Sequence, residues 1–178
     1  AGLRAYRFGP VSFLIVIYAD VLRALPPLVL ILLVFFGLPN VGVVLPAFTV
    51  LYLVLTLVLA AFAEEIVWAG ITATSKGQWE AARSTGLGFT QALAYVVLPQ
   101  AVRMVIPPLT NRAIAITKMT ALGMVIGVPD ILGQATTAQS FSANASPLTL
   151  AAITYVILFL PFVIASRWLE ERFKAPGA

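Results

Sequence analysis

The 178-residue sequence contains no cysteine and no histidine, and only 10% of its residues are charged. The first two absences exclude disulfides, Cys or His metal ligands and a histidine general base, and they leave an intramembrane enzyme without a convincing nucleophile–base pair. No GxxxxGK[ST] phosphate-binding loop is present either. We therefore expect neither catalysis nor a bound cofactor.

Apolar residues are abundant instead. They make up 61% of the chain, against about 45–50% in an average soluble domain, where about 25% of residues are charged. The apolar residues occur in separate runs, and no internal repeat is found. This pattern predicts a single polytopic, all-α membrane domain over residues 1–178.

Four apolar blocks are candidate membrane spans. The block from Val43 to Ala63 has 21 residues without a charge and would extend about 31 Å as a helix, which matches the hydrocarbon thickness of a bilayer. The first block is interrupted at Pro26-Pro27, so we expect an interfacial helical stretch up to about Leu25 that leads into the membrane near Leu28. The approximate spans are 26–37, 43–63, 105–128 and 148–168.

The block 105–128 contains polar residues that suit a protein interior better than lipid. We expect Asn111 to cap a helix that restarts after a break at Pro107-Pro108, although contact with a solute is an alternative. Lys118, deep in the same block, is expected to pair either with a solute carboxylate or with Glu64 or Glu65.

The distribution of basic residues predicts the orientation. All eleven avoid the connections 37–42 and 129–147, whose only charge is Asp130. By the positive-inside rule these two connections face outward, and segment 64–104 and both chain ends face the cytoplasm. The net charge of +4 is then explained by topology and anionic lipid, so no nucleic-acid partner is expected. The basic residues are Arg4, Arg7, Arg23, Lys76, Arg83, Arg103, Arg112, Lys118, Arg167, Arg172 and Lys174.

The cytoplasmic segment is predicted to form two short helices. Ser75 and Gln78 have the spacing of a capping box, which predicts a helix start. Gly86 would end that helix in a left-handed conformation, and a second helix would run from about Phe89 and end before Pro99. A polar–apolar loop lying flat on the membrane is the alternative. One face of the two helices would carry Trp79, Ala82, Gly86, Phe89, Leu93 and Val97.

The spacing inside this segment resembles a known motif. Glu80-Ala81-Ala82, three residues, Gly86, nine residues and then Val96-Val97-Leu98-Pro99 are similar to the EAA loop of ABC-transporter permease subunits, here spanning 74–99. In that family the loop is the cytoplasmic docking site for the ATPase. The resemblance implies that coupling depends on Glu80, Ala81, Ala82, Gly86, Leu98 and Pro99.

Longer stretches resemble binding-protein-dependent permeases for polar amino acids. They are Lys76–Arg83 (KGQWEAAR), Leu98–Arg103 (LPQAVR), Ile106–Asn111 (IPPLTN) and Val125–Asp130 (VIGVPD). The resemblance implies a type I importer bundle in the bacterial plasma (inner) membrane. Such subunits usually have five core spans, so this chain looks N-terminally truncated, with four spans present. The implied partners are cytoplasmic ATPase subunits, an extracytoplasmic solute-binding protein and a second permease subunit, alike or different.

The membrane half departs more from the family than the loop does. The usual FRGTPLLVQ, AEI-RGGI and KDTSL stretches read LRALPPLVL, EEIVWAGI and KMTAL here. These changes indicate a less polar or differently charged solute, or a divergent copy working beside a more typical permease. The pathway candidates are Lys118, Asn111, Glu65 and Thr120. An ion-coupled secondary transporter using Lys118, Glu64 and Glu65 remains the alternative; an inverted repeat would favour it.

Overall fold

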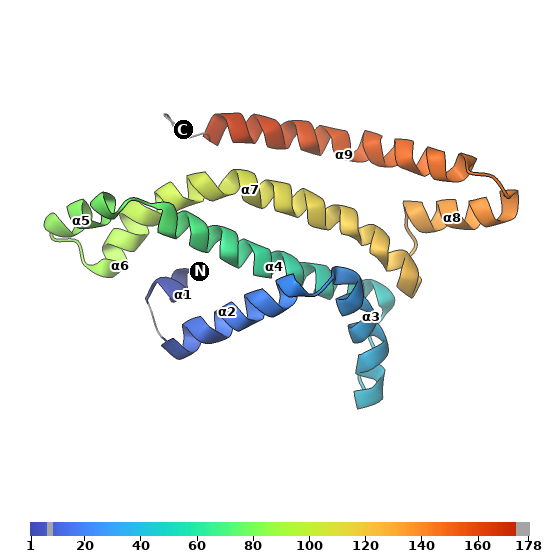
Figure 1. Ribbon diagram of the computed structural model, residues 1–178, viewed down its shortest axis with the longest axis horizontal. Coiled ribbons are helices and arrows are strands. Elements are labelled where there is room, and N and C mark those ends of the chain that lie inside the picture. Colours follow the sequence, from blue (N-terminus) through green and yellow to red (C-terminus); the bar gives the residue numbers. More distant parts are fainter. Residues whose placement is uncertain (7–8, 174–178) are drawn as a thin grey trace.

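The computed structural model describes residues 1–6 and 9–173 and is helical (Figure 1). Arg7 and Lys174, two of the basic residues counted above, lie outside the described residues. The α-helices are α1 (Gly2–Ala5), α2 (Gly9–Ala24), α3 (Pro27–Gly37), α4 (Ala47–Ala73), α5 (Lys76–Ser84), α6 (Phe89–Ala92), α7 (Leu98–Lys118), α8 (Ile131–Ser142) and α9 (Ser146–Phe173). Shorter helical segments are the 3₁₀ helices Leu38–Val41 and Met119–Ile126 and the π-helix Leu93–Val97.

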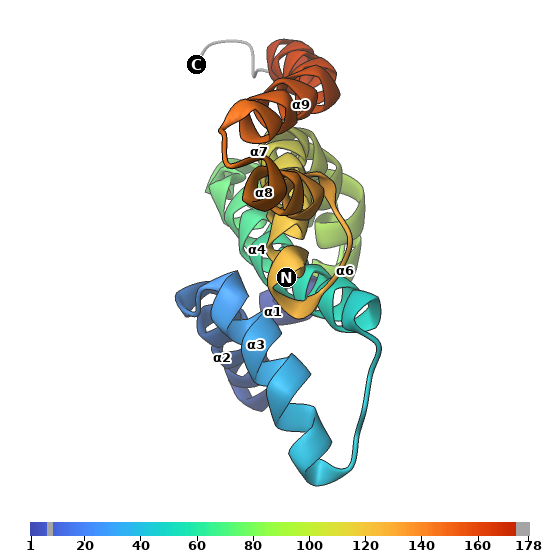
Figure 2. The same ribbon diagram turned by 90° about the vertical axis from the view of Figure 1, so that its right-hand side faces the viewer.

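Helices α4, α7 and α9 run along the long axis of the molecule (Figure 1). Helix α4 packs on α7, and α7 packs on α9, while α2 and α3 pack on α4. The end view in Figure 2 shows these layers stacked, with α3 projecting from the stack. Helices α5 and α6 lie at one end and α8 at the other (Figure 1). The charge pattern assigns segment 64–104, which contains α5 and α6, to the cytoplasm and segment 129–147, which contains α8, to the outside. In the fold these two segments lie at opposite ends of the molecule (Figure 1).

Several helices match the dimensions of a bilayer. Within residues 1–6 and 9–173, the segments Ala47–Ala73, Phe89–Ile126 and Ser146–Phe173 are long and apolar enough to cross one. Helices α2 and α3 would add a fourth crossing if taken together, but they are bent by 100° at the break between them. The expected interruption at Pro26-Pro27 is confirmed, because Pro26 is extended and Pro27 begins α3.

The main core lies where α3, α4 and the end of the α7 segment meet. Ile31, Val50 and Val58 are almost completely inaccessible, and Ile116 belongs to the same cluster. Nearer the α5 end, α4 approaches α7 at Gly70, where an added Cβ would lie 2.4 Å from Val105 Cγ1. Only a residue without a side chain allows this approach, so Gly70 fixes how α4 and α7 cross.

The expected helix end before Pro99 is wrong. The helical path continues from α6 through the π-helix Leu93–Val97 into α7. In the π-helix the Leu98 N–H donates to the Leu93 carbonyl, five residues earlier. The wider turn changes the hydrogen-bonding register just before Pro99, the second residue of α7, which has no N–H to donate. A π-turn therefore carries the chain past a proline that the sequence indicates as a stop.

The expected break at Pro107-Pro108 is also wrong, since both prolines lie inside α7. Two prolines remove two backbone donors, but α7 is held on one side by α4 and on the other by α9. The Thr110 hydroxyl also donates to the Ile106 carbonyl at 2.8 Å. Tertiary packing outweighs the local penalty here. Asn111 is consequently a mid-helix residue, and its expected role as a helix cap is wrong.

Candidate functional site

Helix α5 begins at Lys76, as the sequence predicts, but without the expected capping box. The Ser75 side chain makes no capping hydrogen bond. The Gln78 side-chain oxygen instead accepts a hydrogen bond from Gln100 Nε2 at 3.2 Å. Because Gln100 belongs to α7, this contact connects α5 to the long membrane helix.

The end of α5 has the predicted geometry. Gly86 has φ = +88°, and its N–H donates to the Arg83 carbonyl at 3.0 Å. The next N–H, of Leu87, donates to the Ala82 carbonyl at 3.3 Å. These two hydrogen bonds form a Schellman motif, in which the left-handed residue is usually glycine. The sequence prediction for Gly86 is confirmed.

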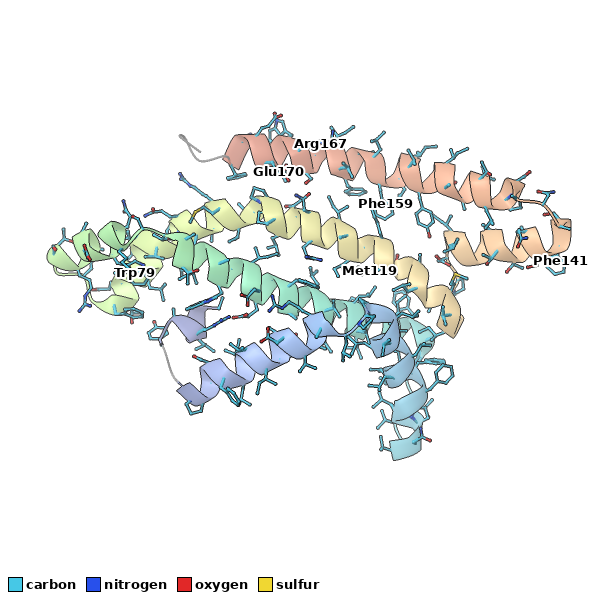
Figure 3. All side chains as sticks on the ribbon, in the orientation of Figure 1. Trp79, Met119, Phe141, Phe159, Arg167 and Glu170 are labelled. Atoms are coloured by element: carbon cyan, nitrogen blue, oxygen red, sulfur yellow. The ribbon has the colours of Figure 1, made fainter. Side chains whose placement is uncertain are left out.

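The apolar face predicted for α5, α6 and the following π-helix is partly buried. The rings of Trp79 and Phe89 stack at 5.3 Å with an interplanar angle of 19° (Trp79 in Figure 3). Ala82 is 6% exposed, and Leu93 and Val97 are buried. The predicted shared face therefore packs on the protein itself at Ala82, Leu93 and Val97, whereas Trp79 is half-buried and Phe89 and Gly86 are exposed. The outward surface of the loop includes Glu80, Ala81, Arg83, Ser84, Thr85 and Gly86.

The residues of the EAA-like motif lie partly on the outward surface of the loop and partly on its buried side. Glu80, Ala81 and Pro99 are exposed, and Leu98 is half-buried, so these residues are available to a partner. Ala82 supports the loop from within. Among the described residues, Glu80 makes no ion pair with Arg83, so its carboxylate is free for a contact outside this chain.

The N-terminal segment braces the loop, which sequence reasoning did not foresee. The ring of Tyr6 meets Phe89 edge-on at 5.3 Å, and the Tyr6 hydroxyl donates to Thr90 Oγ1 at 3.2 Å. Arg4, two residues earlier, lies 4.5 Å from the centroid of the Trp68 ring. No local motif marks Tyr6, because its partners are more than 80 residues away.

A cluster of charged residues joins α1, α2 and α4. Arg4 Nη1 lies 3.4 Å from Glu64 Oε2 and 3.3 Å from Glu65 Oε2. Arg23 Nη2 lies 2.6 Å from Asp20 Oδ1 and 3.7 Å from Glu65 Oε2. The expected pairing of Lys118 with Glu64 or Glu65 is therefore wrong. Both glutamates take basic partners from the first 23 residues, which lie beside α4 in the fold.

The four pathway candidates do not converge on one cavity. Lys118 and Asn111 both line a cavity of about 680 Å³ beside the α2–α3 break. Thr120 lines a different cavity, of about 240 Å³, between α4 and α7. Glu65 lies in the charged cluster that joins α1, α2 and α4. Asn111 also bridges to α9, donating to Glu170 Oε1 and accepting from the Ser166 hydroxyl.

Cavities follow the inner side of α9. One of about 570 Å³ lies between α8 and α9 near Asp130, and one of about 460 Å³ surrounds Lys118 and Phe159. The second shares Val163 with the 680 Å³ cavity. Phe159 points from α9 toward α7 (Figure 3), and its ring centroid lies 5.6 Å from Lys118 Nζ.

Asp130 fixes the start of α8. Its carboxylate accepts hydrogen bonds from the N–H groups of Leu132 at 3.3 Å and Gly133 at 2.8 Å, as an N-cap does. The Tyr155 hydroxyl donates to Asp130 Oδ2 at 3.1 Å, which joins α8 to α9. The sequence marks Asp130 as a lone charge and as the end of the Val125–Asp130 stretch, but nothing in it indicates the helix cap or the contact with Tyr155.

The fold and these features define an integral membrane transport subunit: a helical bundle with cavities along its spans and a short-helix loop at one end. The family model described as "Binding-protein-dependent transport system inner membrane component" matches residues 1–175. The chain belongs to this family. It is a multi-pass inner-membrane permease component of an ABC transporter and not itself the catalytic subunit.

Individual relatives agree with the family. The chain is 36% identical to the "Probable glutamine ABC transporter permease protein GlnM" of Bacillus subtilis (strain 168), over 98% of this chain and 81% of the relative. It is 32% identical to the "Arginine transport system permease protein ArtQ" of the same organism, over 94% and 78%. Among solved structures, the chain is similar to the "Crystal structure of an amino acid ABC transporter with histidines". The match includes 93% of this chain and 78% of the chain in that structure, with 36% sequence identity and a TM-score of 0.86.

Membership in this family decides between the two classes of transporter that the sequence left open, an ABC permease and an ion-coupled secondary transporter. A binding-protein-dependent ABC transporter implies an ATPase and a binding protein as partners. The ion-coupled secondary transporter, which was the alternative, has no support from these likenesses.

Proposed function

We propose that this chain forms, with a second permease subunit, the translocation pathway for an amino acid or a similar small solute. The relatives named above carry glutamine or arginine in their names, and the similar solved structure is of an amino acid transporter. The departures in the membrane half favour a solute that differs in charge or polarity from those of the typical relatives. A binding protein would deliver the solute to the α8 end.

The geometry of residues 74–99, which we call the coupling loop, is the observation that carries this proposal. Helix α5 ends at a left-handed glycine, and Glu80, Ala81 and Arg83 on its outward surface are exposed, while Trp79 is half-buried and stacks on Phe89 of α6. The Gln78–Gln100 hydrogen bond and the π-turn join the loop to α7. A displacement of α5 by an ATPase subunit would therefore be transmitted to the helix that carries Lys118 and Asn111.

The energy source that drives solute uptake tests the proposal directly. The complex of permease, ATPase and binding protein in proteoliposomes should accumulate solute only with ATP in contact with the ATPase subunits. Dissipating proton and sodium gradients should leave the uptake unchanged. Uptake driven by an ion gradient without ATP would contradict the assignment.

Labelling in cells tests the orientation. Thr85, in the loop, and Ala138, on α8, occupy opposite ends of the molecule, and both are exposed. The chain has no cysteine of its own, so each substitution introduces a single reactive thiol. Ala138→Cys should react with an impermeant thiol reagent in intact cells, and Thr85→Cys only after the membrane is opened. Labelling of Thr85→Cys in intact cells would contradict the predicted orientation and, with it, the predicted contact with the ATPase.

A further inference from the structure

A cavity of about 700 Å³ lies between the N-terminal segment, the end of α4 and the helices α5 and α6. Its inner wall includes Ile71 and Thr74, which are buried, and Trp68, which is half-buried. Tyr6 and Phe89 line its exposed rim. None of the four pathway candidates is among the residues that line it.

Four of the lining side chains are aromatic and come from three separate parts of the chain. Trp79 stacks on Phe89, and Tyr6 meets the same ring edge-on. Trp68, on α4, adds a fourth ring (Trp79 in Figure 3). Cavities of about 300–1,000 Å³ with apolar and aromatic walls and a few polar groups are typical of small-molecule sites. A planar apolar group would pack well against such walls.

Two opposite charges, Lys76 and Glu80, also line the cavity. They are four residues apart on α5 and therefore on one side of the helix, separated by about 6 Å along its axis. Within residues 1–6 and 9–173 neither side chain forms a salt bridge. Arg4, which lies near Trp68, is already paired with Glu64 and Glu65.

The cavity thus presents one ammonium and one carboxylate group, both unpaired, beside an aromatic wall. A simple anion would pair with Lys76 but would be repelled by Glu80, and a simple cation would meet the reverse. A zwitterion can pair with both charges at once. The aromatic wall additionally favours a zwitterion that carries an apolar ring.

We propose that this cavity binds a free amino acid with an aromatic side chain. Its carboxylate pairs with Lys76, its ammonium group pairs with Glu80, and its ring packs against Trp68 and Trp79. This site is separate from the translocation pathway and goes beyond the proposed function. Because Glu80 also lies on the outward surface of the coupling loop, the bound amino acid competes with the ATPase for this carboxylate and lowers ATP hydrolysis.

The tryptophans of the chain supply a direct measurement of binding. Of the three tryptophans, Trp68 and Trp79 line the cavity, and Trp168, near the end of α9, does not. W168F therefore leaves fluorescent indoles only at the cavity. Titrating the full chain with W168F in nanodiscs with L-phenylalanine should change this fluorescence.

Phenethylamine and 3-phenylpropionate are the matched probes, since each keeps the phenyl ring and lacks one charged group of phenylalanine. We expect phenylalanine to bind about threefold or more tightly than either, as for one partly exposed ion pair. K76M should make phenylalanine and phenethylamine bind equally, and E80Q should do the same for phenylalanine and 3-phenylpropionate. Each variant should keep the other preference, which shows that the cavity is still formed.

Arg83 provides the control on the same helix. It is exposed and does not line the cavity, so R83M should keep both preferences. Loss of a preference in R83M equal to the loss in K76M or E80Q would attribute the effect to the general charge of α5 and overturn the proposal. Equal binding of all three probes to the W168F chain, or no fluorescence change with phenylalanine, would also overturn it.

The effect on coupling is measured in proteoliposomes that contain the permease, the ATPase and the binding protein. Phenylalanine on the ATPase side should lower solute-stimulated ATP hydrolysis at least about twofold at saturation, and K76M should require more phenylalanine for the same inhibition. Unchanged hydrolysis when the cavity is occupied would refute the competition with the ATPase. ATP-dependent solute uptake without phenylalanine would still support the proposed function in each of these cases, so the two failures are distinguishable.

Discussion

Replacing Gly86 by valine should reduce solute-stimulated ATP hydrolysis by at least tenfold while the permease still inserts into the membrane. Gly86 has φ = +88°, where a branched side chain costs about 1–2 kcal/mol. An added Cβ would meet no atom of the chain within 4 Å. The expected defect therefore comes from the altered turn and from a side chain projecting toward the ATPase, not from a clash inside the permease.

Gly42 provides the matched control for this prediction. It also has a left-handed backbone, with φ = +81°, and an added Cβ would meet no atom within 4 Å, but it lies in the connection between α3 and α4, away from the coupling loop. Gly42→Val should impose a similar strain and leave coupling intact. Gly86→Asn should be milder than Gly86→Val, since asparagine tolerates the left-handed region. ATPase stimulation and solute accumulation in proteoliposomes measure all three variants. Equal losses in Gly42→Val and Gly86→Val would refute a specific role for the loop.

The features that the sequence predicts correctly are those with a local cause. Gly86 follows a run of helix-forming residues, so its left-handed conformation depends on the few residues before it. The four-residue spacing of Leu93 and Val97 likewise predicts that both lie on one face of a helix, and both are buried.

The errors occur where distant parts of the chain decide the conformation. Pro99 and Pro107 look like helix stops locally, but a π-turn and packing against α4 and α9 carry the helix past both. The partners of Glu64 and Glu65 come from α1 and α2, some 60 and 40 residues away, and no spacing rule connects them. Sequence alone could not choose these partners over Lys118, because the choice depends on which side of α4 faces the N-terminal segment.

Replacing Arg4 by methionine should lower the free energy of unfolding by about 3–5 kcal/mol, since removing one partner of a buried ion pair leaves the other charge uncompensated. The Glu64 side chain is 9% exposed and that of Arg4 is 19% exposed. Methionine keeps part of the volume of Arg4, so lost packing against Trp68 contributes less than lost charge. Thermal unfolding of the purified protein measures the effect.

Arg23→Met tests whether burial or charge number sets this cost. Arg23 also pairs with two carboxylates, but Asp20 is 58% exposed and Glu65 is 37% exposed, so water can solvate them when the arginine is removed. We expect a loss of about 1 kcal/mol or less. Equal destabilisation by the two variants would show that the cluster acts only through total charge.

Because Arg4 and Tyr6 lie on the same short segment, and Tyr6 contacts Phe89 and Thr90, Arg4→Met should also weaken ATPase coupling, whereas Arg23→Met should not. A stable Arg4→Met variant with normal coupling would mean that the N-terminal segment does not position the loop.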